Sequence, residues 1–286
     1  MRLILLIIFF ATTLRAEIIK DLRGYEFDIT ESPKRVITNT PSITELIFAL
    51  GSGDTIVASS RFCRFPEEAQ RTEKIGGFID LDYEKVVKLK PDLFILTNFT
   101  DYSISDKLTA LNIKNFTLRK EGLDNLVADI RTLGKIFHKE ENAEKLAKEI
   151  EAKVLFLNAK TAGQKKPRAI LMFGNMAAGK GSYATQLLEC AGAENCLANS
   201  IGKWPVPSKE FIITMNPDIL ILEMKKDDDE NALINSYKKN PIWATTNAVK
   251  NDRIYTIDSD IISIPSSRVI SALDALNEIV EKSKNN

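Results

Sequence analysis

The sequence predicts an α/β protein of two Rossmann-like lobes that are joined by a single long helix, with a ligand cleft between them. Three observations support this fold class. Residues 84–96 (EKVVKLKPDLFIL) recur without a gap as residues 210–222 (EFIITMNPDILIL). Strand-like and helix-like runs alternate in both halves of the chain, which is typical of parallel sheets covered by helices. Between the halves, residues 139–163 have the periodicity of one charged helix.

The repeated segment describes the same structural unit twice. In each copy a short helix carries a Glu at its start, a Pro-Asp pair interrupts the helix, and a run of branched apolar residues follows. This order predicts a helix that leads into a buried strand of a parallel sheet. Two copies so far apart favour two similar lobes over a solenoid, whose repeats are about 20–50 residues long. Small molecules usually bind in the cleft that two lobes leave between them.

The first lobe is predicted to span residues 17–138. Its first helix has clear boundaries, because Pro41 sets the start, Ser42 is a suitable cap, Glu45 stands at the capping-box position and Gly51 ends the helix. The remaining elements alternate along the lobe. Helices are expected at 42–50, 83–89 and 123–137, and strands at 35–39, 55–59, 92–96 and 114–117.

The linking helix is predicted over residues 139–163. Its apolar residues recur at helical spacing, and it ends at a turn-like GQKKP sequence. A single helix leaves two lobes little freedom, unlike a flexible Gly/Ser linker. The second lobe is expected to span residues 164–286, with strands at 168–173, 218–222 and 253–257 and a final amphipathic helix at 268–282.

The N-terminal 16 residues predict a cleavable secretory signal. A positive start, Met1-Arg2, precedes the apolar run 3–11, and the small residue Ala16 is the expected cleavage point. The apolar run is too short for a membrane-spanning helix, which needs about 20 residues. We therefore expect an exported, periplasmic protein whose mature chain starts near Glu17.

Composition excludes several classes of function. The chain has 39 basic and 39 acidic residues and no basic stripe, so no nucleic-acid partner is expected. The single histidine, His138, lies in a charged stretch and is interpreted as a solvated surface residue. A metal site built from histidines and a Ser-His-Asp triad are excluded by this count. No metal site and no cofactor are predicted.

The three cysteines leave two interpretations open. Cys190 and Cys196 are close enough in sequence to form a disulfide in an oxidising compartment, which would leave Cys63 unpaired. The alternative is that all three are free thiols, because geometry decides whether two nearby cysteines pair.

A glycine-rich segment resembles a phosphate-binding loop. Residues 174–182 read GNMAAGKGS and follow a predicted strand, which nearly matches G-x-x-x-x-G-K-[ST]. Gly181 stands where that loop needs a hydroxyl to hold magnesium. An exported nucleotide-binding enzyme that uses Lys180 is therefore a remote alternative, and a glycine-rich turn facing the cleft is the simpler interpretation.

Several stretches together resemble a known family. They read RVITNTPSITELIFALG and FPEEAQRTEKIGGFIDLDYEKVVKLKPDLFIL in the first lobe, and LECAGAENC and KWPVPSKEFIITMNPDILIL in the second. Over about residues 34–282 the chain is similar to periplasmic substrate-binding proteins of the iron-siderophore, haem and vitamin B12 group. The resemblance implies a monomeric binding protein rather than an enzyme, which delivers a ligand to an ABC permease in the inner membrane.

The resemblance also implies functional residues. Within the family the vitamin B12 members are the most similar, and their pocket positions correspond here to an aromatic set with one acid, Phe62, Phe78, Phe173, Trp204 and Asp260. Aromatic faces suit a corrinoid because they offer a large apolar area at low entropic cost. Glu84 and Glu210, the repeated acids, correspond to the positions that dock on permease arginines. Helix-terminus stabilisation is the alternative role for both acids.

A ferric siderophore is the alternative ligand. An anionic iron chelate would need several arginines in the cleft. The candidates are Arg61, Arg64 and Arg119, while Arg268 is expected to have a structural role at a helix start.

Overall fold

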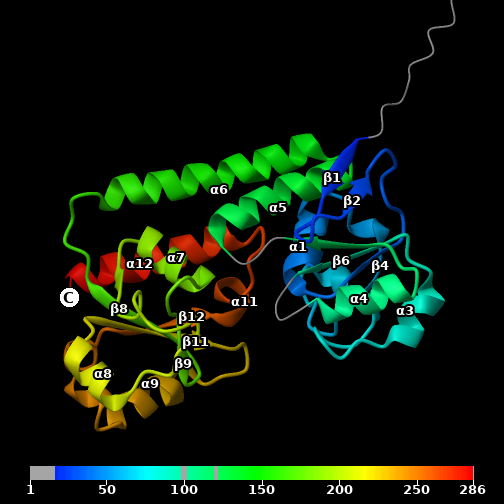
Figure 1. Cartoon of the computed structure of the whole chain (residues 1–286). Helices are drawn as coiled ribbons and strands as arrows, with labels where there is room; N and C mark the ends of the chain where they lie inside the picture. Colours follow the sequence, from blue (N-terminus) through cyan, green and yellow to red (C-terminus); the bar gives the residue numbers. More distant parts are fainter. Residues whose placement is uncertain (1–16, 98–101, 119–121, 286) are drawn as a thin grey trace, which may run out of the picture.

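A computed structural model describes residues 17–97, 102–118 and 122–285. The predicted signal sequence, residues 1–16, lies outside the described residues. Figure 1 shows two lobes side by side, with α5 (Leu123–Ile136) and α6 (Glu140–Thr161) running along one side of both. The long helix expected at 139–163 is therefore present as α6.

The first lobe is built on a parallel sheet of five strands in the order β5-β4-β3-β6-β7. Counted along the chain, this is the order 3-2-1-4-5 of a Rossmann-like sheet. The strands are β3 (Val36–Thr38), β4 (Ile56–Ser59), β5 (Glu73–Lys74), β6 (Leu93–Thr97) and β7 (Asn115–Leu118). The helices of this lobe are α1 (Pro41–Ala49), α2 (Glu67–Gln70), α3 (Tyr83–Leu89), α4 (Ser103–Ala110) and α5, with a 3-10 turn η1 (Gly53–Thr55).

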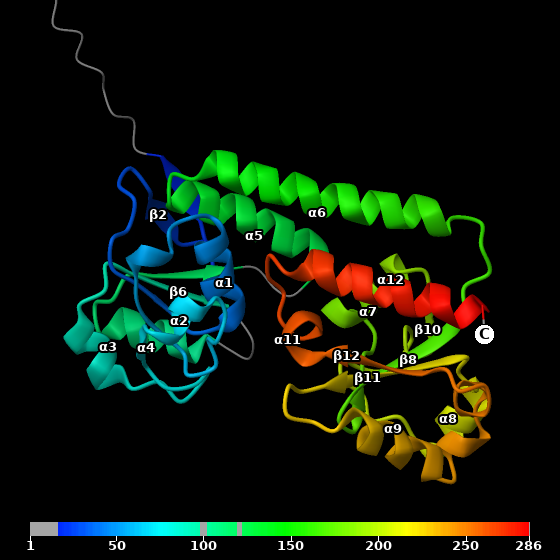
Figure 2. The same cartoon turned by 180° about the vertical axis from the view of Figure 1, so that it is seen from behind.

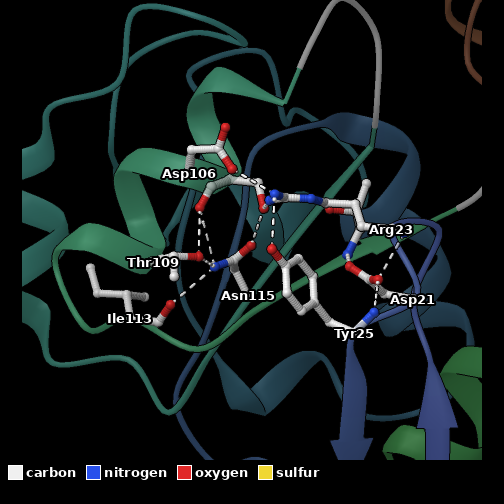
Figure 3. Close-up of polar contacts among 9 residues, drawn as sticks. Asp21, Arg23, Tyr25, Asp106, Thr109, Ile113 and Asn115 are labelled. Carbon is white, nitrogen blue, oxygen red and sulfur yellow. Dashed lines mark hydrogen bonds and ion pairs between the residues drawn. The ribbon is translucent and has the colours of Figure 1, made fainter.

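The sequence analysis did not predict the N-terminal hairpin, which consists of β1 (Ile18–Lys20) and β2 (Glu26–Asp28). Arg23, in the turn between the two strands, reaches into the lobe. Its guanidinium pairs with Asp106 of α4 at 2.5 Å and hydrogen-bonds the Ser105 hydroxyl (Figure 3). Asp21 accepts hydrogen bonds from the backbone N–H groups of Arg23 and Tyr25. These contacts anchor the start of the described chain.

The start of α1 differs from the expectation. Thr40 is the N-cap, and its hydroxyl accepts from the Ile43 N–H, so Ser42 lies inside the first turn. Glu45 does not fold back as a capping box but turns toward Arg268 of the second lobe. Gly51 follows the helix with φ 78°, as its predicted role as a stop requires.

The sheet of the second lobe has five strands: four run in the order β10-β8-β11-β12, and β9 pairs antiparallel to β8. Counted along the chain without β9, the order is 2-1-3-4, the start of the other common doubly wound arrangement. The strands are β8 (Arg168–Phe173), β9 (Met176–Ala177), β10 (Glu194–Asn195), β11 (Ile219–Met224) and β12 (Ile254–Asp258). The helices are α7 (Tyr183–Cys190), α8 (Lys209–Met215), α9 (Glu230–Lys239), α10 (Asn247–Lys250), α11 (Ser259–Ile262) and α12 (Val269–Asn285), with a 3-10 turn η2 (Trp243–Thr245).

The repeated segment forms the same unit in both lobes, as predicted. It becomes α3 followed by β6 in the first lobe and α8 followed by β11 in the second. Each helix ends at a residue in the left-handed region, Lys90 with φ 47° and Asn216 with φ 41°. The Asp of the repeated Pro-Asp pair has the same role in both lobes. Asp92 accepts from the Lys34 and Arg35 N–H groups, and Asp218 accepts from the Arg168 N–H.

One apolar core extends through both lobes beneath α5 and α6. It joins strand residues of the first sheet, such as Ile95, to α5, α6 and α12 and to Leu171 of the second sheet. Two smaller clusters lie on the outer faces of the sheets. Because the shared core packs against the linking helix, the lobes are joined by more than the covalent chain.

All three cysteines are free thiols. Cys63 and Cys196 are buried, and Cys190 is half-buried at the end of α7. The disulfide between Cys190 and Cys196 that the spacing allows is not formed. Burial raises the pKa of the Cys196 thiol to about 12, which disfavours the reactive thiolate.

Candidate ligand-binding site between the lobes

The carboxyl edges of the two sheets face each other. Ser42 and Glu45 follow the end of β3, and they hydrogen-bond the Pro265 carbonyl and Arg268, which follow the end of β12. Phe65, in the loop after β4, lies under the Arg268 guanidinium at 4.4 Å. Ligands of doubly wound folds bind outside the carboxyl ends of the strands, so this arrangement directs both binding edges toward one cleft.

A cavity of about 570 Å³ opens at the carboxyl edge of the second sheet. It lies where the strand order reverses, between β8 and β11, the position at which doubly wound sheets bind their ligands. Its size is within the range of small-molecule sites. All of its described lining residues belong to the second lobe. They include Met172, Phe173, Met176, Tyr183, Trp204, Leu222, Glu223, Lys225, Tyr237, Ile262 and Ser263.

Two of the predicted ligand residues meet in this cavity. The rings of Phe173 and Trp204 pack edge to face, with centroids 5.0 Å apart. Phe173 ends β8 and is almost buried, while Trp204 lies in a loop and remains 39% exposed. That loop is held against the β8–β9 hairpin, because the Lys203 and Pro205 carbonyls accept from the Gly179 and Ala177 N–H groups. Trp204 therefore presents a fixed aromatic surface to the cavity.

Polar groups that the sequence analysis missed complete the cavity wall. The Ser263 hydroxyl donates to Glu223 at 2.7 Å, and the Tyr237 hydroxyl donates to the Gly174 carbonyl at 3.3 Å. Glu223 follows directly after the buried run 218–222, at the edge where ligands bind. A polar residue immediately after a buried strand was the available signal for Glu223. No comparable signal marked Tyr237, which comes from α9.

The other predicted aromatic pair belongs to the first lobe. Phe62 and Phe78 stack at a tilt with ring centroids 4.6 Å apart, and both are more than a third exposed. They follow β4 and β5, and the Asn39 side chain donates to the Phe78 carbonyl from the end of β3. This pair does not line the 570 Å³ cavity as described. The structure thus gathers the four aromatic residues into one pair on each lobe.

Arg61 is already paired within its own lobe. Its guanidinium contacts Asp80 at 2.6 Å and lies 5.2 Å from the Phe62 ring centre. The hydrogen bond from Arg61 lowers the pKa of the Asp80 carboxyl. A Cβ on Gly77 would stand 2.3 Å from an Asp80 oxygen, so the pair depends on a glycine there. Arg61 thus supports the Phe62–Phe78 surface and is not a free cation.

The remaining candidates are not part of the two aromatic pairs. Asp260 is exposed in the first turn of α11, two residues before the cavity-lining Ile262. Arg64 is exposed, and Arg119 lies outside the described residues. Arg268 has the structural role expected of it, at the start of α12.

The glycine-rich loop 174–182 does not form a phosphate cradle. The loop turns back into the β8–β9 hairpin at Gly174 instead of wrapping around an anion. Five of its backbone N–H groups already donate to protein acceptors. The acceptors are the Pro205, Leu171 and Lys203 carbonyls for residues 177–179, the Ser200 hydroxyl for Lys180 and the Gly179 carbonyl for Ser182. These hydrogen bonds argue against the nucleotide-binding interpretation, because a phosphate site needs N–H groups that point at the ligand.

Glu84 and Glu210 are exposed in the first turns of α3 and α8. Figures 1 and 2 show these helices at the outer ends of the two lobes, on the side away from α6. An exposed apolar side chain stands three residues after each acid, Val87 at 46% and Ile213 at 50% exposure. Residues three apart lie on one face of a helix, so each lobe presents the same acid and apolar pair.

Two features are absent from the part of the chain that the structure describes, a metal-binding cluster and a membrane-spanning helix. No group of three or more His, Cys, Asp or Glu side chains is arranged to hold a metal ion. No helix among the described residues is long and apolar enough to cross a membrane.

Comparisons with known proteins agree with this architecture. Residues 36–261 match the periplasmic binding protein family model, and the chain belongs to that family. It is 25% identical over 273 residues to an uncharacterized ABC transporter substrate-binding lipoprotein of Bacillus subtilis, covering 92% of this chain and 84% of that protein. It is 33% identical over 195 residues to the vitamin B12-binding protein of Salmonella typhimurium, covering 67% and 73% of the two chains.

Solved structures share this fold. The crystal structure of the periplasmic vitamin B12 binding protein of Vibrio cholerae superposes with a TM-score of 0.77 at 22% identity, covering 89% of this chain and 99% of that one. The protein is thus a two-lobed periplasmic binding protein, and its relatives include an ABC transporter substrate-binding lipoprotein and vitamin B12-binding proteins.

Proposed function

We propose that this protein is the periplasmic substrate-binding component of an ABC importer, that it binds a corrinoid such as cobalamin between its lobes, and that it delivers this ligand to a membrane permease. The observation that carries the proposal is the pair of aromatic surfaces, Phe62 with Phe78 on one lobe and Phe173 with Trp204 on the other. The protein works as an exported monomer and makes or breaks no bond.

The aromatic surfaces favour a large, flat ligand with apolar faces. Aromatic side chains contribute large contact areas at low conformational cost, and a corrin ring presents such an area. The likeness to the Salmonella vitamin B12-binding protein supports the same class of ligand. Asp260 and Glu223, near the cavity, would accept hydrogen bonds from the amide groups at the ring's edge.

A ferric siderophore is the second candidate, and the described arginines favour it less. Anionic chelates need unpaired guanidinium groups, whereas Arg61 is paired with Asp80 and Arg268 with Glu45. Arg64, which is exposed, is the remaining described candidate, and a single exposed arginine is a weak basis for binding a multiply charged anion.

The first test is calorimetric titration of residues 17–286 with cyanocobalamin, with haemin and a ferric catecholate in parallel. We expect one-to-one binding of cyanocobalamin that Trp204→Ala weakens at least tenfold, equivalent to about 1.4 kcal/mol. Phe156→Ala is the matched control, because Phe156 is an aromatic residue 60% exposed on α6, away from the cavity. Binding of the catecholate alone would keep the transport role and reject the corrinoid.

Delivery to the permease is proposed to use the two matched surfaces, Glu84 with Val87 and Glu210 with Ile213. Acids placed symmetrically on the two lobes suit a two-fold partner with basic residues, since complementary charges set orientation and encounter rate. The double charge reversal Glu84→Arg and Glu210→Arg should abolish uptake of labelled cyanocobalamin by cells and leave its affinity unchanged. The control reverses two exposed acids of α6, Glu141 and Glu149. Loss of ligand affinity in the first variant would contradict a docking role.

A further inference from the structure

A strap between the lobes, residues 263–268, connects the ligand cavity to the first lobe. Its first residue, Ser263, lines the cavity and donates to Glu223 at 2.7 Å. Its last residue, Arg268, precedes α12 and faces the first lobe. The strap is therefore one wall of the cavity at one end and an interlobe contact at the other.

Glu45 of α1 holds the far end of the strap. The Arg268 Nε atom lies 2.9 Å from one Glu45 oxygen and the Nη2 atom lies 2.6 Å from the other, so the contact is bidentate. The Glu45 side chain is 1% exposed and the Arg268 side chain 18%. The Phe65 ring covers the guanidinium at 4.4 Å. Bidentate Arg–carboxylate contacts fix geometry more closely than other ion pairs do.

A second contact holds the middle of the strap to the same helix. The Ser42 hydroxyl, one turn before Glu45, donates to the Pro265 carbonyl. Two charged groups of the second lobe act on Glu45, the Arg268 guanidinium and the Asp260 carboxylate. Burial raises the pKa of Glu45, and the hydrogen bonds from Arg268 only partly offset this. The side chain stays in this position because Arg268 compensates its removal from water.

We propose that Glu45 is a positioning residue for the ligand site: through Arg268 it sets the angle between the lobes and the place of the cavity wall at Ser263. Glu45 does not line the cavity as described. Its side chain would act on the ligand only through the strap, which shifts when the carboxylate is lost. The effect on ligand affinity rests on the proposed binding function. The effect on the distance between the lobes can be measured without any ligand.

The test measures the distance between the lobes in ligand-free protein, residues 17–286. Spin labels are placed at Lys88→Cys on α3 and Lys239→Cys on α9, two exposed positions on different lobes, with Cys190→Ser to remove the half-buried thiol. The variants are Glu45→Gln, which keeps the side-chain shape, and Arg268→Lys, which keeps the charge but loses the bidentate contact. Arg131→Met is the control, because Arg131 pairs with Glu144 and Glu151 between α5 and α6, away from the cleft edges.

We expect Glu45→Gln and Arg268→Lys to broaden and shift the interlobe distance distribution, with no change in Arg131→Met. Cyanocobalamin affinity should fall about tenfold, or 1.4 kcal/mol, in the two variants. An unchanged distribution in folded variants would overturn the proposal, and so would loss of folding in both variants, since the pair would then serve folding alone. Absence of cyanocobalamin binding in the native protein would reject the corrinoid ligand while the distance measurement still decides the role of Glu45.

Discussion

Gly134→Ala tests whether α5 and α6 pack as closely as the structure shows. Gly134 lies in the last turns of α5, and a Cβ there would stand 2.4 Å from the Ala143 Cβ on α6. The Glu140 Cα and the Lys139 carbonyl oxygen would be 3.4 Å away. A methyl group has no rotamer by which to escape, so the first turn of α6 would have to move.

The expected sign follows from two opposing magnitudes. In an exposed helix, Gly→Ala stabilises by about 1 kcal/mol because the glycine loses more entropy on folding. Overpacking a tight contact costs about 1–3 kcal/mol. Because all three neighbours of the new methyl are backbone atoms or a short side chain, we take the upper part of that range and expect a net loss of about 1–2 kcal/mol in the free energy of unfolding.

The assay is urea unfolding followed by circular dichroism, compared with Ala143→Gly and with the double variant. Ala143→Gly removes the methyl group that the new side chain would meet. The double variant should therefore regain most of the stability that the clash costs. The two substitutions should therefore be non-additive, as expected for residues in contact. A Gly134→Ala protein more stable than the native one, or strict additivity in the cycle, would refute the close packing.

Two further predictions concern the rest of the fold. A disulfide exchange reagent at neutral pH should not modify Cys63 or Cys196 in the native protein, because both are buried and the pKa of Cys196 is raised to about 12. Protein that is unfolded without a reductant should show three reactive thiols, and a smaller number would reveal a disulfide. Asp218→Ala should lower the free energy of unfolding by about 1–3 kcal/mol, because the carboxylate accepts from the Arg168 N–H at 3.0 Å and from α10 at 3.1 Å. An unchanged urea midpoint would contradict this role.

Local patterns were sufficient for several of the main elements of the fold. The helix at 139–163, the α5 pattern and the two copies of the repeated unit appear in the structure within a residue or two of their predicted bounds. These features depend on apolar periodicity and helix-ending signals, which act over a few neighbouring residues. The alternation of strands with helices was likewise enough to predict parallel sheets, because a parallel pair needs a crossover between its strands.

The same reasoning failed where several local choices were equally good. Ser42 and Thr40 are both suitable caps, and only the backbone conformation selects Thr40. The hairpin of β1 and β2 was missed because each strand is three residues long, too short to show an alternating pattern. The glycine-rich loop resembled a phosphate site because its sequence nearly matches the phosphate-loop motif. In the structure, its Ala177 and Gly179 N–H groups donate to a loop some 25 residues further on.

The sequence by itself determined the class of fold, the two-lobed plan and the matched acids Glu84 and Glu210, since all of these depend on order and spacing along the chain. Only the tertiary structure decided which side chains act together. Glu45 and Arg268 are 223 residues apart, and Arg61 had many possible acidic partners before Asp80 was brought beside it. Partners across such separations are chosen by how the sheets and helices pack, and no local pattern in the chain specifies that choice.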